Sequence, residues 1–324
     1  MKLDFQKIEK RKNLLAFSGG VDSMALFYLL KDANIDFDLI IVNYNARLES
    51  KEELEFAINL AKKYGKKIFV KELDLKNSSN FEKVARDIRY EFFKEIIKEN
   101  SYEVLITAHQ LNDKLEWFFM QLSKGAGLVE LLGMSEFEEK DAYKIYRPLL
   151  NISKKKLQEY LDKNSLKYFI DSSNFDTKYR RNYFRKEFAN RFLDEFENGV
   201  KNSFEFLKKD LNSLNIKFEA IFSKLELEVF ENLKDDNLNL RVIDKSLKKR
   251  GFLLSSKERV EILRQKELTI SHKINISINE KYIFIAPKVD ISLPKEFKEV
   301  CRVNKIPANI RTYIFSNNIT LFLP

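Results

Sequence analysis

The stretch that decides the fold runs from Leu14 to Met24 and reads LLAFSGGVDSM. Its apolar start is typical of a buried strand, its two adjacent glycines mark a tight bend, and a helical pattern begins beyond them. In a strand, turn and helix of this kind, the N–H groups at the start of the helix point toward one place and can bind an anion. The stretch predicts a phosphate-binding turn or, as the simpler alternative, a tight turn in which Asp or Ser caps the helix.

The side chains around the glycines favour phosphate binding. The hydroxyls of Ser18 and Ser23 add hydrogen-bond donors for phosphate oxygens. Asp22 would repel a phosphate unless a cation lay between them, so the turn predicts a nucleotide with Mg²⁺ beside Asp22. The lysine of the G-x-x-x-x-G-K-[ST] loop is absent, which disfavours Walker-type hydrolysis.

Strand and helix patterns alternate along the first part of the chain. Apolar runs predict strands at residues 13–18, 38–44, 66–73 and 103–108, and a return segment, KIYRPLL, follows at 144–150. Helical patterns cover residues 22–32, 50–64, 81–99, 111–123 and 153–165, the last with Ser153 as its N-cap. Strands that alternate with helices predict an α/β fold with a doubly wound, mostly parallel sheet. Ligands of such sheets bind beyond the carboxyl ends of the strands, where the glycine turn falls.

The texture of the sequence changes past about residue 195, where long charged helical patterns begin. We expect one domain over residues 1–198 and a second, mixed α+β domain over residues 199–324. The second domain is predicted to be helical to about residue 265. The alternating segments 269–278 and 281–286 then predict a small antiparallel sheet.

Composition limits the class of protein. A net charge of +9 favours a polyanionic partner, although a lysine-rich surface without a partner explains it equally well. Cys301 is the only cysteine, which excludes an intramolecular disulfide, a cysteine-based zinc site and two-cysteine sulfur chemistry and predicts an inert core residue. The charged N-terminus is unlike a signal peptide, and no apolar run reaches the ~18–20 residues of a membrane span. We expect a cytoplasmic protein with no membrane partner.

A second polar motif, TAHQLNDKLEW, occupies residues 107–117. His109, Asp113 and Glu116 would share one helical face if the helix began near Asn112. Their spacing leaves three interpretations open: an acidic pocket for an ammonium group, a metal site, or a solvated first helical turn.

Two further segments carry arginines. In EKVARDIRYEFF at 82–93, Arg86 and Arg89 lie opposite the apolar positions of the predicted helix and could clamp phosphates or face solvent. In residues 167–186, an acidic and hydroxyl-rich turn precedes five basic residues interleaved with Tyr179, Tyr183 and Phe184. This second pattern fits single-stranded RNA, or else an amphipathic helix with a basic outer face.

Taken in order, these segments resemble the tRNA(Ile)-lysidine synthetases of the PP-loop (N-type) ATP pyrophosphatase superfamily. The matching motifs are SGGVDS at 18–23, E-x-x-A-R-x-x-R-Y-x-F-F at 82–93, T-A-H-x-x-x-D-x-x-E at 107–116, K-G-A-G and L-L-G-M through 134, R-P-L-L at 147–150, and D-x-S-N followed by Y-x-R-N-x-x-R at 171–185. The resemblance implies the adenine nucleotide α-hydrolase-like fold.

It also implies a two-step ligation. The wobble cytidine of tRNA(Ile) with a CAU anticodon attacks the α-phosphate of ATP through its O2, and the amine of L-lysine then displaces AMP from C2. By the same resemblance, the second domain would bind tRNA. The reaction would require ATP and Mg²⁺. Whether the protein is a homodimer is left open.

The resemblance assigns roles residue by residue. The implied nucleotide-binding residues are Ser18, Gly19, Gly20, Val21, Asp22, Ser23 and Arg89. The implied catalytic residues are Asp22, His109, Asp113 and Glu116, of which Asp113 and Glu116 also recognise lysine. The residues implied to contact tRNA or ATP are Arg86, Arg181, Asn182 and Arg185.

The chain also departs from the family's usual pattern. Asn43 and Asn45 stand where histidines are usual, with Arg47 and Leu48 as the only match nearby, and Asn112 and Trp117 replace a common Asp and a common Thr. Three alternatives to lysine ligation remain: a tRNA thiolase, which would need cysteines that this chain lacks; an enzyme that amidates a small molecule; and a non-catalytic RNA-binding protein on the same scaffold.

Overall fold

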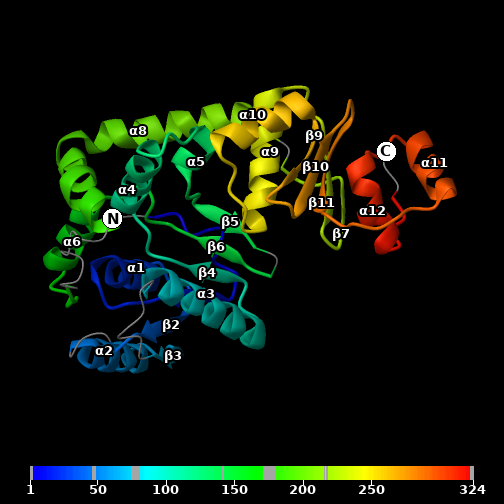
Figure 1. Ribbon diagram of the computed structural model, residues 1–324. Coiled ribbons are helices and arrows are strands. Elements are labelled where there is room, and N and C mark those ends of the chain that lie inside the picture. Colours follow the sequence, from blue (N-terminus) through cyan, green and yellow to red (C-terminus); the bar gives the residue numbers. More distant parts are fainter. Residues whose placement is uncertain are drawn as a thin grey trace. The chain divides into compact units, whose positions relative to one another are not determined.

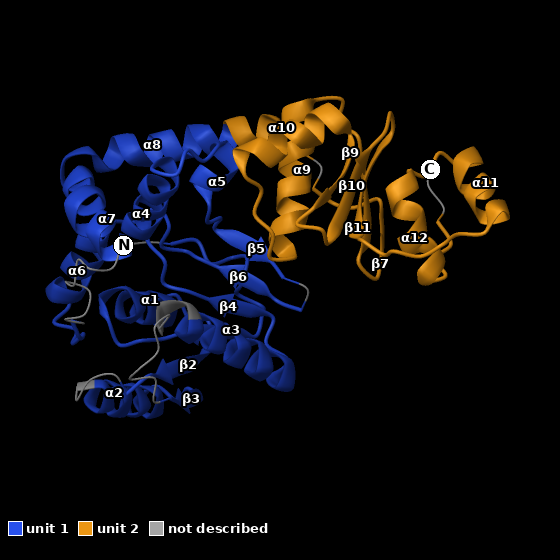
Figure 2. Ribbon diagram, viewed as in Figure 1, with its two compact units in different colours: residues 1–209 blue, residues 210–324 orange. Residues whose placement is uncertain are grey.

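The computed structural model describes residues 3–45, 49–73, 81–140, 142–170, 180–214, 216 and 218–321 (Figure 1). The chain forms two compact units, residues 1–209 and residues 210–324 (Figure 2). Helix α8 (Arg191–Ser213) runs through this division and through the boundary expected at residue 198. The assignment of catalysis to residues 1–198 and of tRNA binding to residues 199–324 stays a prediction.

Unit 1 is built on a six-stranded sheet with the order β3-β2-β1-β4-β6-β5. Its strands are β1 (Asn13–Ala16), β2 (Phe37–Asn43), β3 (Ile68–Glu72), β4 (Val104–Ile106), β5 (Phe137–Glu139) and β6 (Lys144–Tyr146). Every pairing is parallel except that of the edge strand β5 with β6. The predicted mostly parallel sheet is thereby confirmed, although β5 was not foreseen.

Helices cover both faces of this sheet. Helices α1 (Val21–Asp32), α2 (Glu49–Lys63) and α6 (Lys154–Lys163) share a core with Leu15 of β1. The next residue back, Leu14, packs instead with Phe92 and Phe93 of α3 (Phe81–Asn100). Because successive side chains of a strand point to opposite faces, this alternation buries the strand on both sides. The fold is doubly wound, as predicted.

Two helical details differ from expectation. The helical pattern of α3 predicts an apolar stripe of Val84, Ile88, Phe92 and Ile96. Of these, Phe92 is buried as expected, whereas Val84 is exposed, and Ala85, Phe93 and Ile97 are buried beside Phe92. Because Phe93 and Ile97 lie one position beyond Phe92 and Ile96, the buried face of α3 is displaced around the helix. Arg89 is half-buried as a result. Ser153 precedes α6 as predicted, but its hydroxyl donates a hydrogen bond to Glu197 rather than capping the helix.

The helices that follow β4 complete unit 1. They are α4 (Leu111–Leu122), α5 (Leu128–Leu132) and α7 (Arg180–Phe184), and a π-helical turn, η2 (Arg185–Asn190), joins α7 to α8. The basic segment predicted at 178–186 is thus helical from Arg180 onward. Residues 171–179, with their acidic and hydroxyl-rich turn, lie outside the described residues, as do Arg47 and Leu48.

Unit 2 holds a five-stranded antiparallel sheet with the order β7-β8-β11-β10-β9. Its strands are β7 (Phe222–Lys224), β8 (Leu227–Glu231), β9 (Glu267–Ile270), β10 (Ile274–Ile278) and β11 (Tyr282–Pro287). One face packs against α9 (Asp236–Lys249) and α10 (Ser256–Gln265), and the other against α11 (Lys295–Val303) and α12 (Ala308–Ser316). Cys301 is buried in the second of these cores, as predicted for an inert residue.

The prediction of helix from residue 199 to about residue 265 was wrong in its middle. Strands β7 and β8 lie there: Leu227 and Val229 of β8 point to one face of the sheet, and Phe230 is buried on the other. The segment 269–278 is also two strands rather than one, since Ser271 and His272 turn the chain with positive φ angles of 49° and 57°. Among the described residues, no helix is long and apolar enough to cross a membrane.

Candidate active site

The candidate site lies where the strand order of unit 1 reverses. The chain passes from β1 to β2 on one side, whereas β4 pairs with β1 on the other side. Such a switch point opens a crevice beyond the carboxyl ends of the two strands. The glycine turn after β1 and the Thr107–Gln110 loop after β4 both end at this crevice.

The glycine turn after β1 requires its glycines. Gly19 has a φ of +75°, and a Cβ there would lie 3.3 Å from Cδ2 of Phe169. The Phe169 N–H donates a hydrogen bond to the Gly19 carbonyl at 3.0 Å, and this bond helps to fix the turn. Gly20 is the N-cap of α1, and no side chain in the described part of the chain caps that helix. The N–H groups of its first turn thus remain for a ligand, as a phosphate-binding turn requires.

The two predicted serine donors have different surroundings. The Ser23 hydroxyl is buried; it accepts from the Ser18 N–H at 3.2 Å and donates to the Gly20 carbonyl at 3.2 Å. Ser18 is exposed, with its hydroxyl 3.1 Å from that of Ser23. Ser23 therefore fixes the shape of the turn, and Ser18 is the hydroxyl that faces solvent. Val21 is buried in the core beneath them.

Asp22 carries a buried oxygen that fits a cation. Its Oδ1 has no hydrogen-bond partner among the described residues. Burial and the neighbouring Asp113 carboxylate raise the pKa of Asp22 to about 7, against the lowering effect of Lys154 and Arg185. Because buried polar atoms are nearly always paired, a carboxylate oxygen in this state suits a hard cation such as Mg²⁺.

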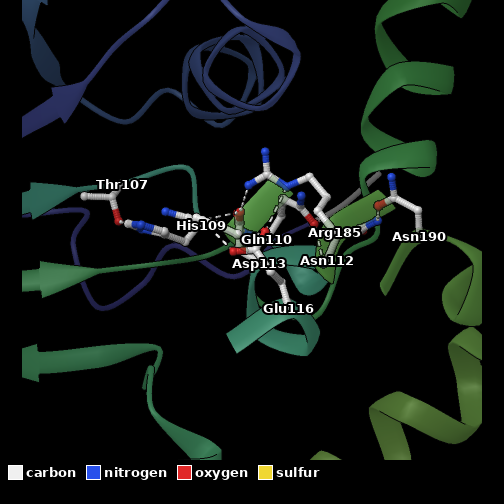
Figure 3. A network of polar contacts seen from close by, with 9 residues as sticks. Thr107, His109, Gln110, Asn112, Asp113, Glu116, Arg185 and Asn190 are labelled. Carbon is white, nitrogen blue, oxygen red and sulfur yellow. Dashed lines mark hydrogen bonds and ion pairs between the residues drawn. The ribbon is translucent and has the colours of Figure 1, made fainter. Parts of the chain in front are cut away.

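The loop after β4 brings His109 to the site without placing it on the helix. Helix α4 begins at Leu111 with Gln110 as its N-cap, and Asp113 Oδ2 accepts from the Gln110 N–H at 3.0 Å (Figure 3). The expected shared helical face is thereby corrected, since His109 precedes the helix. Its Nδ1 lies 2.9 Å from the Thr107 hydroxyl, which orients the ring.

The two carboxylates of α4 meet two arginines of the late basic motif. Arg185 donates to Asp113 Oδ1 at 3.0 Å and to Glu116 Oε2 at 2.9 Å (Figure 3). Arg181 donates to Asp113 Oδ1 at 3.2 Å and also to Glu116. Each guanidinium bridges both carboxylates, so two motifs more than 60 residues apart form one cluster. Asn182, which follows Arg181 on α7, is buried.

The surroundings set the charges of this cluster. Burial acts to raise the pKa of Asp113, but the Arg181 and Arg185 guanidiniums hold it below its ordinary value. Burial, aided by nearby guanidiniums and opposed by Asp113, lowers the pKa of His109 to about 4. At neutral pH the site therefore presents an ionised Asp113 beside a neutral imidazole. No three His, Cys, Asp or Glu side chains in the described segments are grouped so as to hold a metal, so the metal interpretation of this motif is not supported.

The two arginines of α3 differ in their exposure and in what they face. Arg89 is half-buried, and its charge acts on both His109 and the Tyr44 hydroxyl. Arg86 is exposed, with its guanidinium 5.7 Å from the Tyr90 ring. The structure thus brings Arg89 toward the crevice and leaves Arg86 at the surface.

Sequence reasoning missed two residues that organise the site. Asn112 donates to Asn190 of η2 at 2.8 Å and accepts from the Lys154 N–H of α6 at 3.0 Å, so it joins three helical segments. Arg147 is buried, donates to the Ser135 carbonyl at 2.9 Å and to Glu138 at 2.7 Å, and acts on the charge of His109. The R-P-L-L motif was the available signal for Arg147, whereas no local signal pointed to the role of Asn112.

The family model described as a PP-loop domain matches residues 2–192. A tRNA(Ile)-lysidine synthase of Campylobacter jejuni (strain RM1221) is 44% identical over 97% of this chain and 95% of its own length. Those of Helicobacter pylori (strain ATCC 700392 / 26695) and Wolinella succinogenes are 40% and 39% identical, over 97% and 98% of this chain and 93% and 97% of their own lengths.

Among solved structures, the U34-tRNA thiolase NcsA from Methanococcus maripaludis with its [4Fe-4S] cluster aligns with a TM-score of 0.51 at 21% identity. The alignment covers 67% of this chain and 76% of the thiolase. At that identity the likeness shows a shared fold, in agreement with the doubly wound sheet of unit 1. The family model matches more than half of the chain, and the relatives align along nearly all of it. Together they identify the family as well as the fold. The chain belongs to the tRNA(Ile)-lysidine synthase family of PP-loop proteins.

Proposed function

We propose that this chain ligates lysine to C2 of the wobble cytidine of tRNA(Ile) with a CAU anticodon, using ATP. The observation that carries the proposal is the convergence at one crevice of a phosphate-binding turn, the Asp113 and Glu116 carboxylates and a neutral His109. A nucleotide, an amine and a base that transfers a proton are what such a ligation must hold together.

In the first step, cytidine O2 attacks the α-phosphorus of ATP, and pyrophosphate leaves. The turn from Ser18 to Ser23 offers backbone N–H groups to the phosphates, and Arg89 stands across the crevice to stabilise charge on them. Mg²⁺ held by Asp22 would neutralise further phosphate charge. The cytidine becomes an adenylate whose C2 carries AMP as a leaving group.

In the second step, the side-chain amine of lysine attacks C2, loses a proton and expels AMP. Asp113 and Glu116 would hold the ammonium form of lysine at the crevice, sharing or exchanging their present arginine partners. The bound ammonium must lose one proton before the amine can attack C2, and the nitrogen loses a second proton once the C2–N bond has formed. The neutral His109 ring beside Asp113 can accept one of these protons, and the other passes to solvent or to the departing AMP phosphate. Arg181 and Arg185 are suited to stabilise the departing AMP phosphate.

The decisive experiment supplies the protein with labelled L-lysine, ATP and an unmodified tRNA(Ile) transcript. We expect lysine in the RNA, with one AMP and one pyrophosphate released per lysine. A transcript in which the wobble cytidine is replaced by uridine is the matched control and should accept none. Active pyrophosphate release without incorporation of lysine would overturn the proposal.

The same assay distinguishes the other PP-loop activities. Thiolation is disfavoured because Cys301, the only cysteine, is buried in unit 2 and cannot form a cluster or a cysteine pair. Amidation of a small molecule would consume ATP without tRNA, and an RNA-binding protein would bind the transcript without consuming ATP.

A further inference from the structure

A row of exposed and half-buried aromatic side chains lies on the elements that also carry the candidate site. We call Tyr183, Phe184, Phe188 and Phe192, together with Phe119, the aromatic ridge. Tyr183, Phe188 and Phe192 are 44%, 41% and 43% exposed. Large aromatic residues are usually buried, and a contiguous exposed group of them marks a surface that binds something.

The rings of the ridge form an unbroken chain. Phe188 lies 5.7 Å from Tyr183 and 5.5 Å from Phe184, measured between ring centroids. Phe119 then bridges Phe188 and Phe192, at 6.0 Å and 5.9 Å. These contacts hold the rings in fixed places, so their exposed faces are preorganised for a planar ligand.

The ridge shares its helices with the candidate site. Phe119 lies on α4, which also carries Asp113 and Glu116, and the other rings lie on the segment that carries Arg181 and Arg185. Helix α7 and the π-helical turn pack along α4. A π-helical turn alters which residues face outward, and such turns are frequent at functional sites. A ligand on the ridge would therefore lie on the same packed elements that carry Asp113, Glu116, Arg181 and Arg185.

The charge beside the rings identifies the kind of ligand. Residues 180–192 contain five basic side chains and one acidic side chain, whereas residues 193–199 contain three acidic side chains and no basic one. Lys186 and Arg191 are exposed and both pair with the one carboxylate of Glu187, at 4.0 Å and 3.1 Å, so a positive charge remains beside the rings. The Arg180 guanidinium lies 5.7 Å from the centroid of the Phe184 ring. Aromatic faces flanked by cations bind stacked bases and their phosphates in single-stranded RNA. An apolar protein partner has no need of those cations.

We infer that the aromatic ridge stacks the unpaired bases next to the wobble cytidine and thereby holds the anticodon loop over the crevice. This inference rests on the proposed function. Exposed bases on the ridge leave the target base free to leave the stack and enter the site, as enzymes that modify bases require.

The test uses the full-length protein and a tRNA(Ile) anticodon stem-loop in which 2-aminopurine replaces the adenine of the CAU anticodon. Phe188→Leu and Phe192→Leu keep apolar bulk and remove the flat ring, and Phe192→Trp restores a ring. Phe206→Leu is the matched control, because Phe206 is 62% exposed on the same helix α8 but lies outside the ridge. Thermal unfolding of each variant shows that it is folded.

We expect each ridge leucine to weaken stem-loop binding by about tenfold and to reduce quenching of 2-aminopurine, with Phe192→Trp and Phe206→Leu close to wild type. Wild-type affinity and quenching in both ridge leucine variants would overturn the inference. So would a loss of self-association, seen by sedimentation, without a change in RNA affinity. If the wild type quenches 2-aminopurine but never ligates lysine, the proposed function fails and the ridge stands as an RNA-binding surface.

Discussion

The buried carboxylate of Asp22 lowers the stability of the folded protein when no ligand is bound. Its pKa is raised from 3.8 to about 7, so folding takes up a proton between these values and the ionised carboxylate is unfavourable in the native state. The stability of the protein without ligands should therefore fall as pH rises from about 4 to about 7 on account of this group. A bound cation would remove that penalty.

We predict that Asp22→Asn stabilises the protein in EDTA without nucleotide at pH 8, where the wild-type carboxylate is ionised. The gain is a few kcal/mol at most, since one pKa unit corresponds to about 1.4 kcal/mol. It should vanish near pH 4, where the wild-type carboxyl is protonated. Urea unfolding at both pH values measures the difference, and adenylation of tRNA should be lost in the same variant. An equal effect of the substitution at both pH values would contradict this account of Asp22.

Glu116 supports a second prediction at the residue scale. Glu116→Gln keeps the volume of a buried side chain but removes the charge that holds Arg181 and Arg185. Since charge-assisted hydrogen bonds contribute about 1.5–3 kcal/mol, lysine transfer should fall by roughly 10- to 100-fold. ATP–pyrophosphate exchange should fall less, because the phosphate-binding turn is untouched. Equal loss of both activities would refute a role in lysine recognition.

At the scale of elements, replacing Asn112 should destabilise the packing of several helices. Asn112→Ala removes its bonds to Asn190 and to the Lys154 N–H, so it leaves polar groups of η2 and α6 without this partner. We predict a destabilisation of about 1–3 kcal/mol and a lower kcat. Urea unfolding and the ligation assay test both parts. Asn198→Ala, on α8 and exposed, is the control that should change neither.

Most of the secondary structure of unit 1 was predictable because its buried strands are short apolar runs between polar residues. The edge strand β5 (Phe137–Glu139) was not, because its three residues include two glutamates. β8 escaped prediction because its apolar residues, Leu227, Val229 and Phe230, form a very short run among helical patterns. The separate motifs of the site were visible as well. Their pairing was not, because Arg185 meets Asp113 only through tertiary packing of segments 72 residues apart.

At the scale of the whole molecule, the two units have separate cores, and each sheet is completed within one unit. We predict that residues 1–213, which end with α8, fold cooperatively alone and bind ATP. Calorimetry and nucleotide titration test this. If residues 199–324 bind tRNA as expected from sequence, the shortened chain should lose tRNA affinity while keeping ATP affinity. Unchanged tRNA affinity would contradict that assignment.

The net charge of +9 leads to a prediction for the intact protein. If the positive charge binds a polyanion, the logarithm of the tRNA association constant should fall linearly with the logarithm of the salt concentration. The slope should be roughly −0.7 to −0.9 for each phosphate that the protein contacts. A titration from low to physiological salt measures it. A slope near zero would favour the alternative of a lysine-rich surface without a nucleic-acid partner.

Trp117 follows Glu116 on α4, and its indole N–H donates to the Glu130 carbonyl at 2.8 Å. Gly133 makes room for the ring, because a Cβ at that position would overlap the indole. This is the only tryptophan of the chain, so all tryptophan emission originates one residue from a lysine-recognition candidate. Stopped-flow tryptophan fluorescence can therefore follow binding at the carboxylate pair without an added label.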